Sequence, residues 1–195
     1  MRMINSRTGC FQLGILLLST VAWAQPTPEI SGIDVVSGKK AQIQIQGGPS
    51  ATTKDFKASV IFFVSARCPC SASHEQAIRE LSQEFSYPGF QFIGVHSNID
   101  ESLEETKAHF EKSAIPFPIV QDEGAKIAND WGALKTPHVF VVNPKGDILY
   151  QGGVDDSHIR KNAKKYFLRD ALLAIQEGKK PEISLTRTLG CVIAR

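Results

Sequence analysis

The sequence predicts an α/β fold, in which a central mixed sheet is flanked by helices to form a three-layer sandwich. Two short apolar runs, Ser59–Val64 and Phe90–His96, have the composition of strands covered on both faces. Segments with helical spacing follow them, at 73–85 and 101–114. Strands joined through helices should be parallel, whereas two later strands around a turn at 143–146 should be antiparallel.

The first 24 residues have the pattern of a cleavable signal peptide. Arg2 and Arg7 precede the apolar run GILLLSTVAWA, which ends in a small-x-small cleavage pattern at 22–24. The run is shorter than the about 20 residues that a membrane-spanning helix needs. We therefore expect cleavage and export to the periplasm or the outside of the cell, with a retained anchor as the alternative.

Export changes what the cysteines can do, because thiols outside the cytoplasm can be oxidised and stay so. Cys10 leaves with the signal peptide, whereas Cys68, Cys70 and Cys191 remain. Three thiols cannot all pair within one chain. At least one of them is therefore left over or used in turnover.

The charge of the mature chain argues against nucleic acid or anionic lipid as a partner. The formal net charge of the whole chain is +2, and removal of Arg2 and Arg7 takes it to 0. No basic field remains that would attract a polyanion. The remaining length, roughly 170 residues, suits one domain with a hydrophobic core and no transmembrane segment.

The region 25–50 is predicted to contain a strand. In the sequence AQIQIQG, Ile43 and Ile45 alternate with glutamines, which is typical of a half-buried strand. The GGP sequence at 47–49 should end it.

The first buried strand leads directly into two cysteines. Cys68 and Cys70 follow it at once, and SHEQAIRELSQEF then has apolar residues at i, i+3 and i+7. Ser73, or alternatively Ser71, is expected to cap this helix. The cysteines should therefore lie on a strand-to-helix turn.

The later elements follow from similar patterns. Gly132 should end a short helix, and the strands at 138–143 and 147–153 should form the hairpin. The pair Asp155–Asp156 is expected in a turn. The last helix is predicted from about His158 to Glu177.

Two long stretches together resemble a known superfamily. FFVSARCPCSASHE resembles the active-site segment of thioredoxin-like proteins, and LKTPHVFVVNPKGDILYQG resembles their cis-proline loop and hairpin. This version of the loop and hairpin is similar to that of exported redoxins of the alkyl hydroperoxide reductase and thiol-specific antioxidant group. GGVDDSHI and the ending TLGCVI also resemble a redoxin subgroup, so the likeness covers about 30–195. It implies a thioredoxin-like fold and thiol redox chemistry.

The resemblance also implies roles for single residues. Cys68 falls on the attacking cysteine, and Pro137 falls on the cis-proline that lies beside it. Ser71 stands where a C-x-x-C motif has its second cysteine, because here that cysteine is one residue earlier, at Cys70. A cis bond would expose the backbone of Thr136 to an extended substrate chain beside Cys68.

Cys68 is also the expected nucleophile from its position. A thiol must ionise to attack a disulfide, and helix N-termini or neighbouring cations lower its pKa from about 8.5. The helix dipole and Arg67 are both available to Cys68. Ser65 and Thr136 are expected to support the site.

The thiol that partners Cys68 is left open. Residues i and i+2 of a regular helix point to nearly opposite sides. A Cys68–Cys70 disulfide would therefore need a non-helical turn or strain. Cys191 lies in a tail beyond the last helix, where a lone cysteine is most often a packed small hydrophobe. The tail can nevertheless fold back, which makes Cys191 a possible resolving cysteine.

A metal-binding function would use some of the same residues. Cys68, Cys70 and His74 form a C-x-C-x3-H pattern of soft ligands suited to copper(I) or zinc. The spacing is not a standard zinc pattern, however. His74 also lies on the apolar stripe of the helix, which favours a structural role.

A peroxidase is the other enzymatic alternative. Ser65 to Cys68 matches the Ser/Thr-x-x-Cys part of the peroxiredoxin signature, although Ile61 replaces the expected proline. No arginine occurs between Arg79 and Arg160, so Arg67 or Arg160 would have to polarise the peroxide.

We therefore expect an exported thiol–disulfide oxidoreductase, with a thiol peroxidase, a copper(I) chaperone and a non-enzymatic binding module as alternatives. The expected organisation is a signal peptide at 1–24, an N-terminal strand region at 25–50, a thioredoxin-like domain at 51–178 and a tail at 179–195. No cofactor is expected. The partners would be protein or small-molecule thiols and disulfides, with a membrane or periplasmic reductant.

Overall fold

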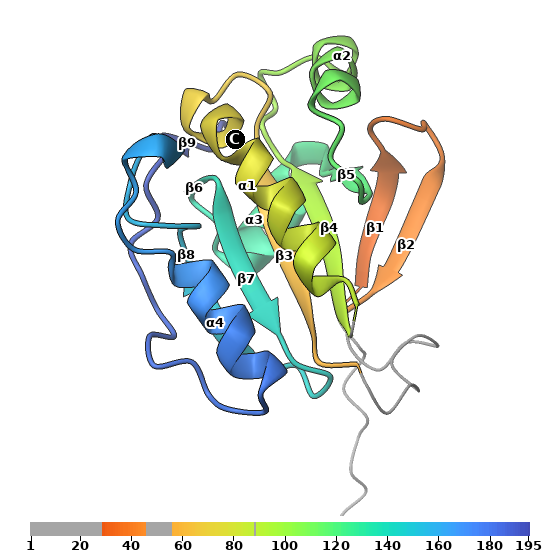
Figure 1. Ribbon diagram of the computed structural model, residues 1–195. Helices are drawn as coiled ribbons and strands as arrows, with labels where there is room; N and C mark the ends of the chain where they lie inside the picture. Colours follow the sequence, from red (N-terminus) through yellow and green to blue (C-terminus); the bar gives the residue numbers. More distant parts are fainter. Residues whose placement is uncertain (1–28, 46–55, 88) are drawn as a thin grey trace, which may run out of the picture.

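A computed structural model describes residues 29–45, 56–87 and 89–195. The predicted signal peptide and the GGP sequence at 47–49 lie outside these residues. A seven-stranded sheet with the order β2-β1-β5-β4-β3-β7-β8 forms the centre of the molecule (Figure 1). Its strands are β1 (Glu29–Asp34), β2 (Lys40–Gln44), β3 (Ala58–Val64), β4 (Phe90–His96), β5 (Ile119–Gln121), β7 (His138–Val142) and β8 (Ile148–Gly152).

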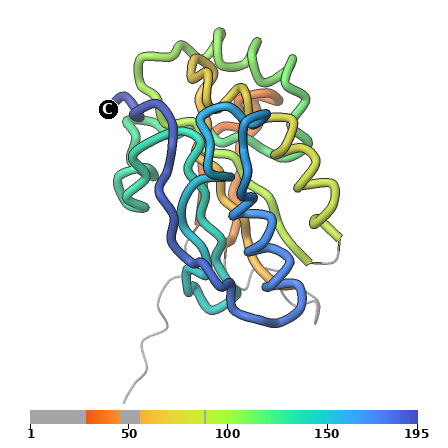
Figure 2. The backbone as a smooth tube through the Cα atoms, turned by 60° about the vertical axis from the view of Figure 1, so that its left-hand side comes forward, coloured from red at the N-terminus to blue at the C-terminus, as the bar shows by residue number. Residues whose placement is uncertain are grey.

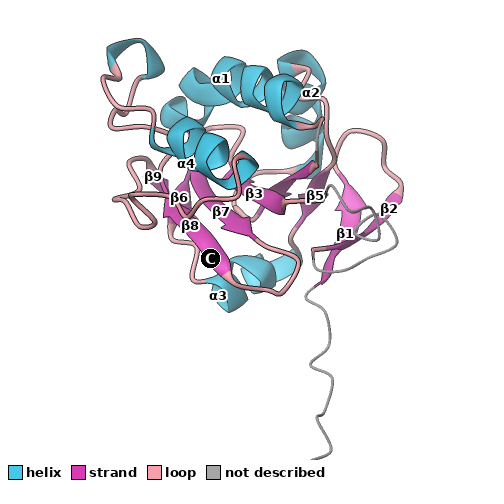
Figure 3. Ribbon diagram, turned by 60° about the horizontal axis from the view of Figure 1, so that its bottom comes forward, coloured by secondary structure: helices cyan, strands magenta, loops and turns pink. Residues whose placement is uncertain are grey.

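Helices cover both faces of this sheet. Figure 3 shows α1, α2 and α4 on one face and α3 on the other, which makes three layers. This arrangement confirms the predicted fold class. In the described part of the chain the helices are α1 (Pro69–Phe85), α2 (Leu103–Ser113), α3 (Lys126–Trp131) and α4 (Phe167–Gln176), with the short 3-10 helices η2 (Glu123–Ala125) and η3 (Arg160–Asn162).

The strand pairings follow the expected connections. β3 pairs parallel with β4, which is reached through α1, whereas β7 and β8 pair antiparallel around the turn at 143–146. Every residue of β3 is buried, because it lies between β4 and β7 with helices above and below. The sequence prediction of a doubly covered strand is confirmed.

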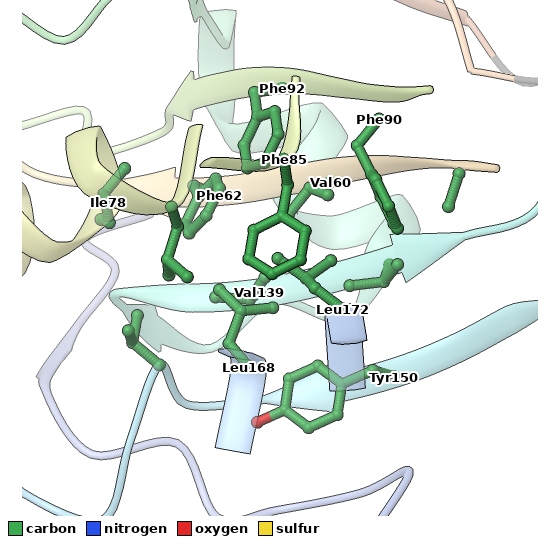
Figure 4. Packing of buried hydrophobic residues seen from close by; sticks show 14 of the residues in the cluster. Val60, Phe62, Ile78, Phe85, Phe90, Phe92, Val139, Tyr150, Leu168 and Leu172 are labelled. Carbon is green, nitrogen blue, oxygen red and sulfur yellow. The ribbon is translucent and has the colours of Figure 1, made fainter. Parts of the chain in front are cut away.

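The larger hydrophobic core lies between the sheet and the layer of α1 and α4 (Figure 4). Phe62 of β3 and Val139 of β7 meet Phe85 of α1 and Leu172 of α4 there, and all four are at most 1% exposed. Complete burial of such side chains contributes roughly 1.5–3 kcal/mol each to folding. This core fixes the end of β3 relative to the start of α1, where the cysteines emerge.

The first helix begins earlier than predicted. Cys68 is its N-cap and Pro69 its first residue, so neither Ser73 nor Ser71 is the cap. The Ser71 hydroxyl instead accepts a hydrogen bond from the Ser65 backbone N–H at 3.2 Å. Proline favours the first helical position, because its missing N–H has no helical partner there.

The last helix begins later than predicted, at Phe167 and not at His158. The Asp156 carboxylate accepts hydrogen bonds from the backbone N–H groups of Lys164 and Lys165 at 2.7 and 3.0 Å. Ala163 is extended. The segment before α4 is therefore a hydrogen-bonded loop with a 3-10 turn, because aspartate offers the backbone an alternative to the helix.

Both ends of the described chain join this architecture. Ile33 of β1 pairs with Gln121 of β5, so the strands from 25–50 lie in the same sheet as those from 51–178. After α4 the C-terminal segment runs back along the molecule towards the start of α1 (Figure 2). There, β9 (Cys191–Val192) pairs with β6 (Lys135–Thr136) in a second, two-stranded sheet. Among the described residues, we find no helix with the length and hydrophobicity of a membrane span.

Candidate active site

Cys68 lies at the junction between β3 and α1 and is 2% exposed. Its backbone N–H donates to the Ser65 hydroxyl at 3.0 Å, and the Ser71 N–H donates to its sulfur at 3.4 Å. The Cys68 thiol donates in turn to the Thr136 carbonyl oxygen at 3.1 Å. The sulfur is therefore held between the start of a helix and the loop that contains Pro137.

The surroundings of Cys68 favour its thiolate. Burial is the largest single influence and raises the pKa of Cys68, but the hydrogen bonds with Cys191, Thr136 and the Ser71 N–H together outweigh it, so the pKa falls below the ordinary value for a cysteine. A charged sulfur at a helix N-terminus is stabilised by unpaired N–H groups.

Cys70 is the second residue of α1 and is half-buried. Its sulfur lies 3.5 Å from Nδ1 of His158, a residue of the loop before α4. Burial first, and then the neighbouring Cys68, raise the pKa of Cys70. Cys70 is therefore the less acidic thiol of the C-x-C pair.

Cys191 reaches the site because the tail adds a strand beside Pro137. It is paired with Thr136 across the β6–β9 ladder. Ile193 anchors the segment, since its side chain is 3% exposed and its N–H donates to the Leu134 carbonyl at 3.0 Å. Burial and the neighbouring Cys68 raise the pKa of Cys191 to about 12.

The three cysteines form one cluster. All three are free, and the sulfurs of Cys68, Cys70 and Cys191 lie within 4.8 Å of one another. The tail therefore folds back onto Cys68 and Cys70, which was one of the two possibilities left open for Cys191. Cys68 is the N-cap of α1, Cys70 lies in the first turn of the same helix, and Cys191 lies in β9, far along the chain.

The loop before β7 has the expected backbone geometry. The peptide bond between Thr136 and Pro137 is cis, as predicted. The Thr136 backbone, which was expected to be open to a substrate chain, is paired with the protein's own tail.

The family model described as Redoxin matches residues 34–166, which is more than half of the chain. The chain belongs to the redoxin family. It is accordingly a redox enzyme with a thioredoxin-like fold.

Other known proteins are similar to this redoxin at lower identity. The chloroplastic peroxiredoxin Q of Oryza sativa subsp. japonica is 24% identical over 168 residues, which covers 73% of this chain and 74% of that protein. The structure of an uncharacterized conserved protein from Geobacillus kaustophilus superposes with a TM-score of 0.74 at 24% identity, over 87% of this chain and 89% of that one.

A third match is the thioredoxin domain of a thiol-disulfide oxidoreductase from Bacteroides vulgatus. It superposes with a TM-score of 0.50 at 20% identity and covers 68% of this chain and 89% of that one. At such identities the structural matches support the thioredoxin-like fold.

In this redoxin a buried carboxylate holds the turn that carries Cys68. Glu101 is 6% exposed and accepts hydrogen bonds from the Ser65 hydroxyl at 2.5 Å and the Ala66 N–H at 2.7 Å. It is also bonded to His96 at 3.0 Å and to the Asn98 amide at 2.5 Å. No local pattern in the sequence marks Glu101, because it lies among exposed acidic residues at a helix start.

Arg67 does not contact the thiols of this redoxin. Its guanidinium donates to both carboxylate oxygens of Glu105 at 2.7 and 2.6 Å, and its side chain is half exposed. The expectation that Arg67 tunes Cys68 has no contact to support it, because its charge is already paired at the surface. Arg160, the other candidate arginine, contacts Asp155 at 3.6 Å and stacks on the Tyr166 ring.

His74 also lies away from the sulfur cluster. Its Nδ1 is 2.6 Å from the Cys70 carbonyl oxygen, and its Nε2 is 3.2 Å from the Asp155 carboxylate. Both ring nitrogens of His74 thus contact other groups. The alternative in which Cys68, Cys70 and His74 form one set of metal ligands is therefore wrong. Asp155 is 2% exposed, so it is a buried partner and more than a turn residue.

Gly190 sets how closely the tail approaches Cys68. A Cβ atom at this position would overlap the carbonyl oxygen and carbon of Thr136, which are backbone atoms and cannot move aside. We expect Gly190→Ala to displace β9 and to slow oxidative cross-linking of Cys68 to Cys191 by roughly 10- to 100-fold. Cross-linking is measured by peptide mapping after a timed pulse of oxidant.

The matched control for this substitution is Val192→Ala. Val192 lies in the same strand, and its side chain is 73% exposed. It should cross-link at the wild-type rate. Equal rates in the Gly190 and Val192 variants would show that close packing at Gly190 is not what positions Cys191.

Proposed function

We propose that this redoxin is an exported thiol–disulfide oxidoreductase. Cys68 is the attacking thiolate, Cys191 is the resolving thiol, and Cys70 can substitute for it. Pro137 and Thr136 shape the loop beside the reacting sulfur, and Ser65 holds the Cys68 backbone. Arg67, which was expected to support the site, has no part in this proposal.

One observation carries the proposal: three free sulfurs lie within 4.8 Å of one another beside a cis-proline loop. Disulfide exchange needs a thiolate, a second thiol within reach, and an accessible path. Cys68 has hydrogen bonds that favour the thiolate, whereas the other two thiols have raised pKa values. This division of properties supports one attacking and one resolving sulfur.

The chemistry proceeds in two exchanges. The Cys68 thiolate attacks one sulfur of a substrate disulfide, forms a mixed disulfide and releases the other sulfur as a thiolate. The Cys191 thiol, after losing its proton, attacks the Cys68 sulfur and releases the second substrate thiolate. Two electrons pass to the substrate, and the enzyme is left with a Cys68–Cys191 disulfide. An external dithiol reductant restores the two thiols.

Cys191 is preferred to Cys70 as the resolving residue for a geometric reason. Cys68 and Cys70 are the cap and the second residue of one helix, so a disulfide between them would distort the helix start. Cys191 comes from a separate strand that pairs with Thr136. A disulfide between Cys68 and this strand leaves the start of α1 undistorted.

Peroxide reduction is the second candidate activity. The relative from Oryza sativa is named a peroxiredoxin, and the Ser/Thr-x-x-Cys match at Ser65 to Cys68 supports the same reaction. Against it, both nearby candidate arginines are engaged with other carboxylates, Arg67 with Glu105 and Arg160 with Asp155. Among the described residues, no cation that could polarise the peroxide contacts Cys68.

Export and the partners belong to the same proposal. The signal-peptide pattern at 1–24 supports delivery to the periplasm or outside the cell, where disulfides persist. The substrates would be protein or small-molecule disulfides. A periplasmic or membrane-bound thiol donor would supply the electrons.

The test uses protein recovered from the periplasmic extract of cells that express the full chain. Its N-terminus is expected at Gln25. Reduction of insulin disulfides in the presence of dithiothreitol should be fast, and consumption of hydrogen peroxide with the same donor should be at least about 100-fold slower, because no arginine among the described residues contacts Cys68. Cys191→Ser should accumulate more of the mixed disulfide than the wild type, because Cys70 resolves it only slowly.

Two results would contradict the proposal. Peroxide consumption faster than insulin reduction would favour the peroxidase. A protein that turns over neither substrate, although its three thiols are intact, would point to a binding module without catalysis.

A further inference from the structure

The oxidoreductase chemistry needs only two of the three clustered thiols at any one time. Any disulfide among Cys68, Cys70 and Cys191 leaves one sulfur free within 4.8 Å of the other two. Three sulfurs gathered from two separate parts of the chain are more than an exchange reaction needs. Three clustered thiols are instead typical of a metal site.

The size of the sulfur triangle suits an ion. A disulfide holds its sulfurs about 2.05 Å apart. Three thiolates that share one ion at a metal–sulfur distance of about 2.3 Å lie roughly 4 Å from one another. The three sulfurs lie within 4.8 Å of one another, which is close to this second value. A small inward movement of the three side chains would bring the sulfurs to the separation that one shared ion requires.

The donor atoms in the triangle are all sulfur. The cluster contains no carboxylate oxygen, and thiolates select copper(I) and zinc over hard cations. Nδ1 of His158 lies 3.5 Å from the Cys70 sulfur, in a loop tied to α1 by a hydrogen bond from the Ser73 hydroxyl to the His158 carbonyl oxygen at 3.2 Å. Structural zinc almost always takes four ligands, whereas copper(I) is satisfied by three thiolates.

The backbone holds the three sulfurs in place. Cys68 and Cys70 begin a helix of 17 residues that is packed on the main core. On the other side, the Ala194 N–H donates to the Asn98 side chain at 3.2 Å, and the Ile99 N–H donates to the Ala194 carbonyl at 3.2 Å. The third ligand is thus delivered by a strand that pairs with Thr136 at Cys191 and is hydrogen-bonded to Asn98 and Ile99 through Ala194.

From this geometry we infer that Cys68, Cys70 and Cys191 bind one copper(I) ion as a three-thiolate site, with His158 at its rim. Binding replaces the thiol protons by sulfur–copper bonds and transfers no electrons. The bound ion and a disulfide exclude each other, because both use the same sulfurs. Metal binding therefore does not depend on the oxidoreductase activity and can be measured without it.

The experiment is an anaerobic titration of the reduced full chain with copper(I), against the chromophoric competitor bicinchoninate. All proteins carry Cys10→Ser, which removes the one thiol outside the cluster. We expect one copper(I) per chain. Cys70→Ser and Cys191→Ser should each weaken binding at least about 100-fold, since loss of an outer-shell partner alone costs 10- to 100-fold.

The control is Val192→Ala, which changes an exposed side chain next to Cys191 and should leave binding unchanged. X-ray absorption of the copper-loaded protein should show three sulfurs at about 2.3 Å. Alkylation followed by mass measurement should find all three thiols protected. Cys70→Ser keeps the test decisive if Cys191→Ser fails to fold, because Cys70 is half-buried at the rim.

Several outcomes would overturn the inference. These are wild-type affinity in Cys70→Ser, a first shell of only two sulfurs, or tighter binding of zinc(II) than of copper(I) in direct competition. Loss of copper(I) binding in His158→Ala would show that the ion is held by His158 together with thiolates, and not by three thiolates alone. Insulin turnover by the metal-free protein is unaffected by all of these results, so failure here leaves the proposed enzyme standing.

Discussion

Cys68→Ser is expected to lower disulfide turnover by roughly 1000-fold or more, because the attacking group must be a thiolate and serine is not ionised at neutral pH. The fold should survive. Cys68 is the N-cap of α1, and serine is among the strongly preferred N-cap residues. Loss of activity with an unchanged melting temperature would therefore report chemistry and not unfolding. Insulin reduction and thermal melting measure the two effects.

The matched control is Cys70→Ser, which changes the neighbouring thiol in the first turn of the same helix. We expect it to retain most of the turnover, because Cys191 resolves the mixed disulfide. If Cys68→Ser keeps most of the activity and Cys70→Ser loses it, the nucleophile is Cys70 and the assignment is wrong.

Glu101→Ala is expected to destabilise the protein by roughly 3–5 kcal/mol, which is the range for breaking a buried charged network. The substitution leaves the Ser65 hydroxyl, the His96 ring and the Asn98 amide without their common acceptor. For a chain of this size the melting temperature should fall by roughly 10 °C. Calorimetry or thermal circular dichroism gives the measurement.

The control is Glu104→Ala, in the first turn of α2, where the glutamate is exposed. Its effect should stay within about 0.5 kcal/mol. A melting temperature of Glu101→Ala equal to that of Glu104→Ala would show that the carboxylate network is not what stabilises the Cys68 turn.

Acid provides a second readout for Glu101. Burial is the largest influence and raises its pKa, but hydrogen bonds from His96, Ser65 and Asn98 lower it from 4.5 to about 2. The unfolded state therefore binds more protons between these values, and the stabilisation is complete above about pH 4.5 and lost as the pH falls towards 2. Its size is roughly 3 kcal/mol. In Glu101→Ala the free energy of unfolding should decline less steeply over this window.

Secondary structure could be predicted where the pattern is local. The apolar composition of Ser59–Val64 and Phe90–His96 identified β3 and β4, and their connection through a helix gave the parallel pairing. Prediction failed at helix ends. The start of α4 is displaced from His158 because Asp156 binds backbone N–H groups further along the chain, and that choice depends on the loop as a whole.

The candidate site was predicted in part. Cys68, Cys70 and the cis bond at Pro137 could be named from the motifs and the family resemblance. Glu101 could not, because a buried glutamate looks like a surface one in sequence, and its contacts with the distant turn at Ser65 and Ala66 are not visible there. Arg67 was misjudged for the converse reason, since adjacency to Cys68 in the chain does not place its long side chain at the sulfur.

By itself, the sequence determined the layered fold and the nucleophile candidate, because the periodicity of apolar residues and a cysteine between a strand and a helix are local features. Only the tertiary structure decided that Cys191, and not His74, completes the group around Cys68 and Cys70. That choice rests on the pairing of β9 with β6 and on the Asp155 side chain beside His74. Both contacts join residues far apart in the chain, so no pattern of neighbouring residues encodes them.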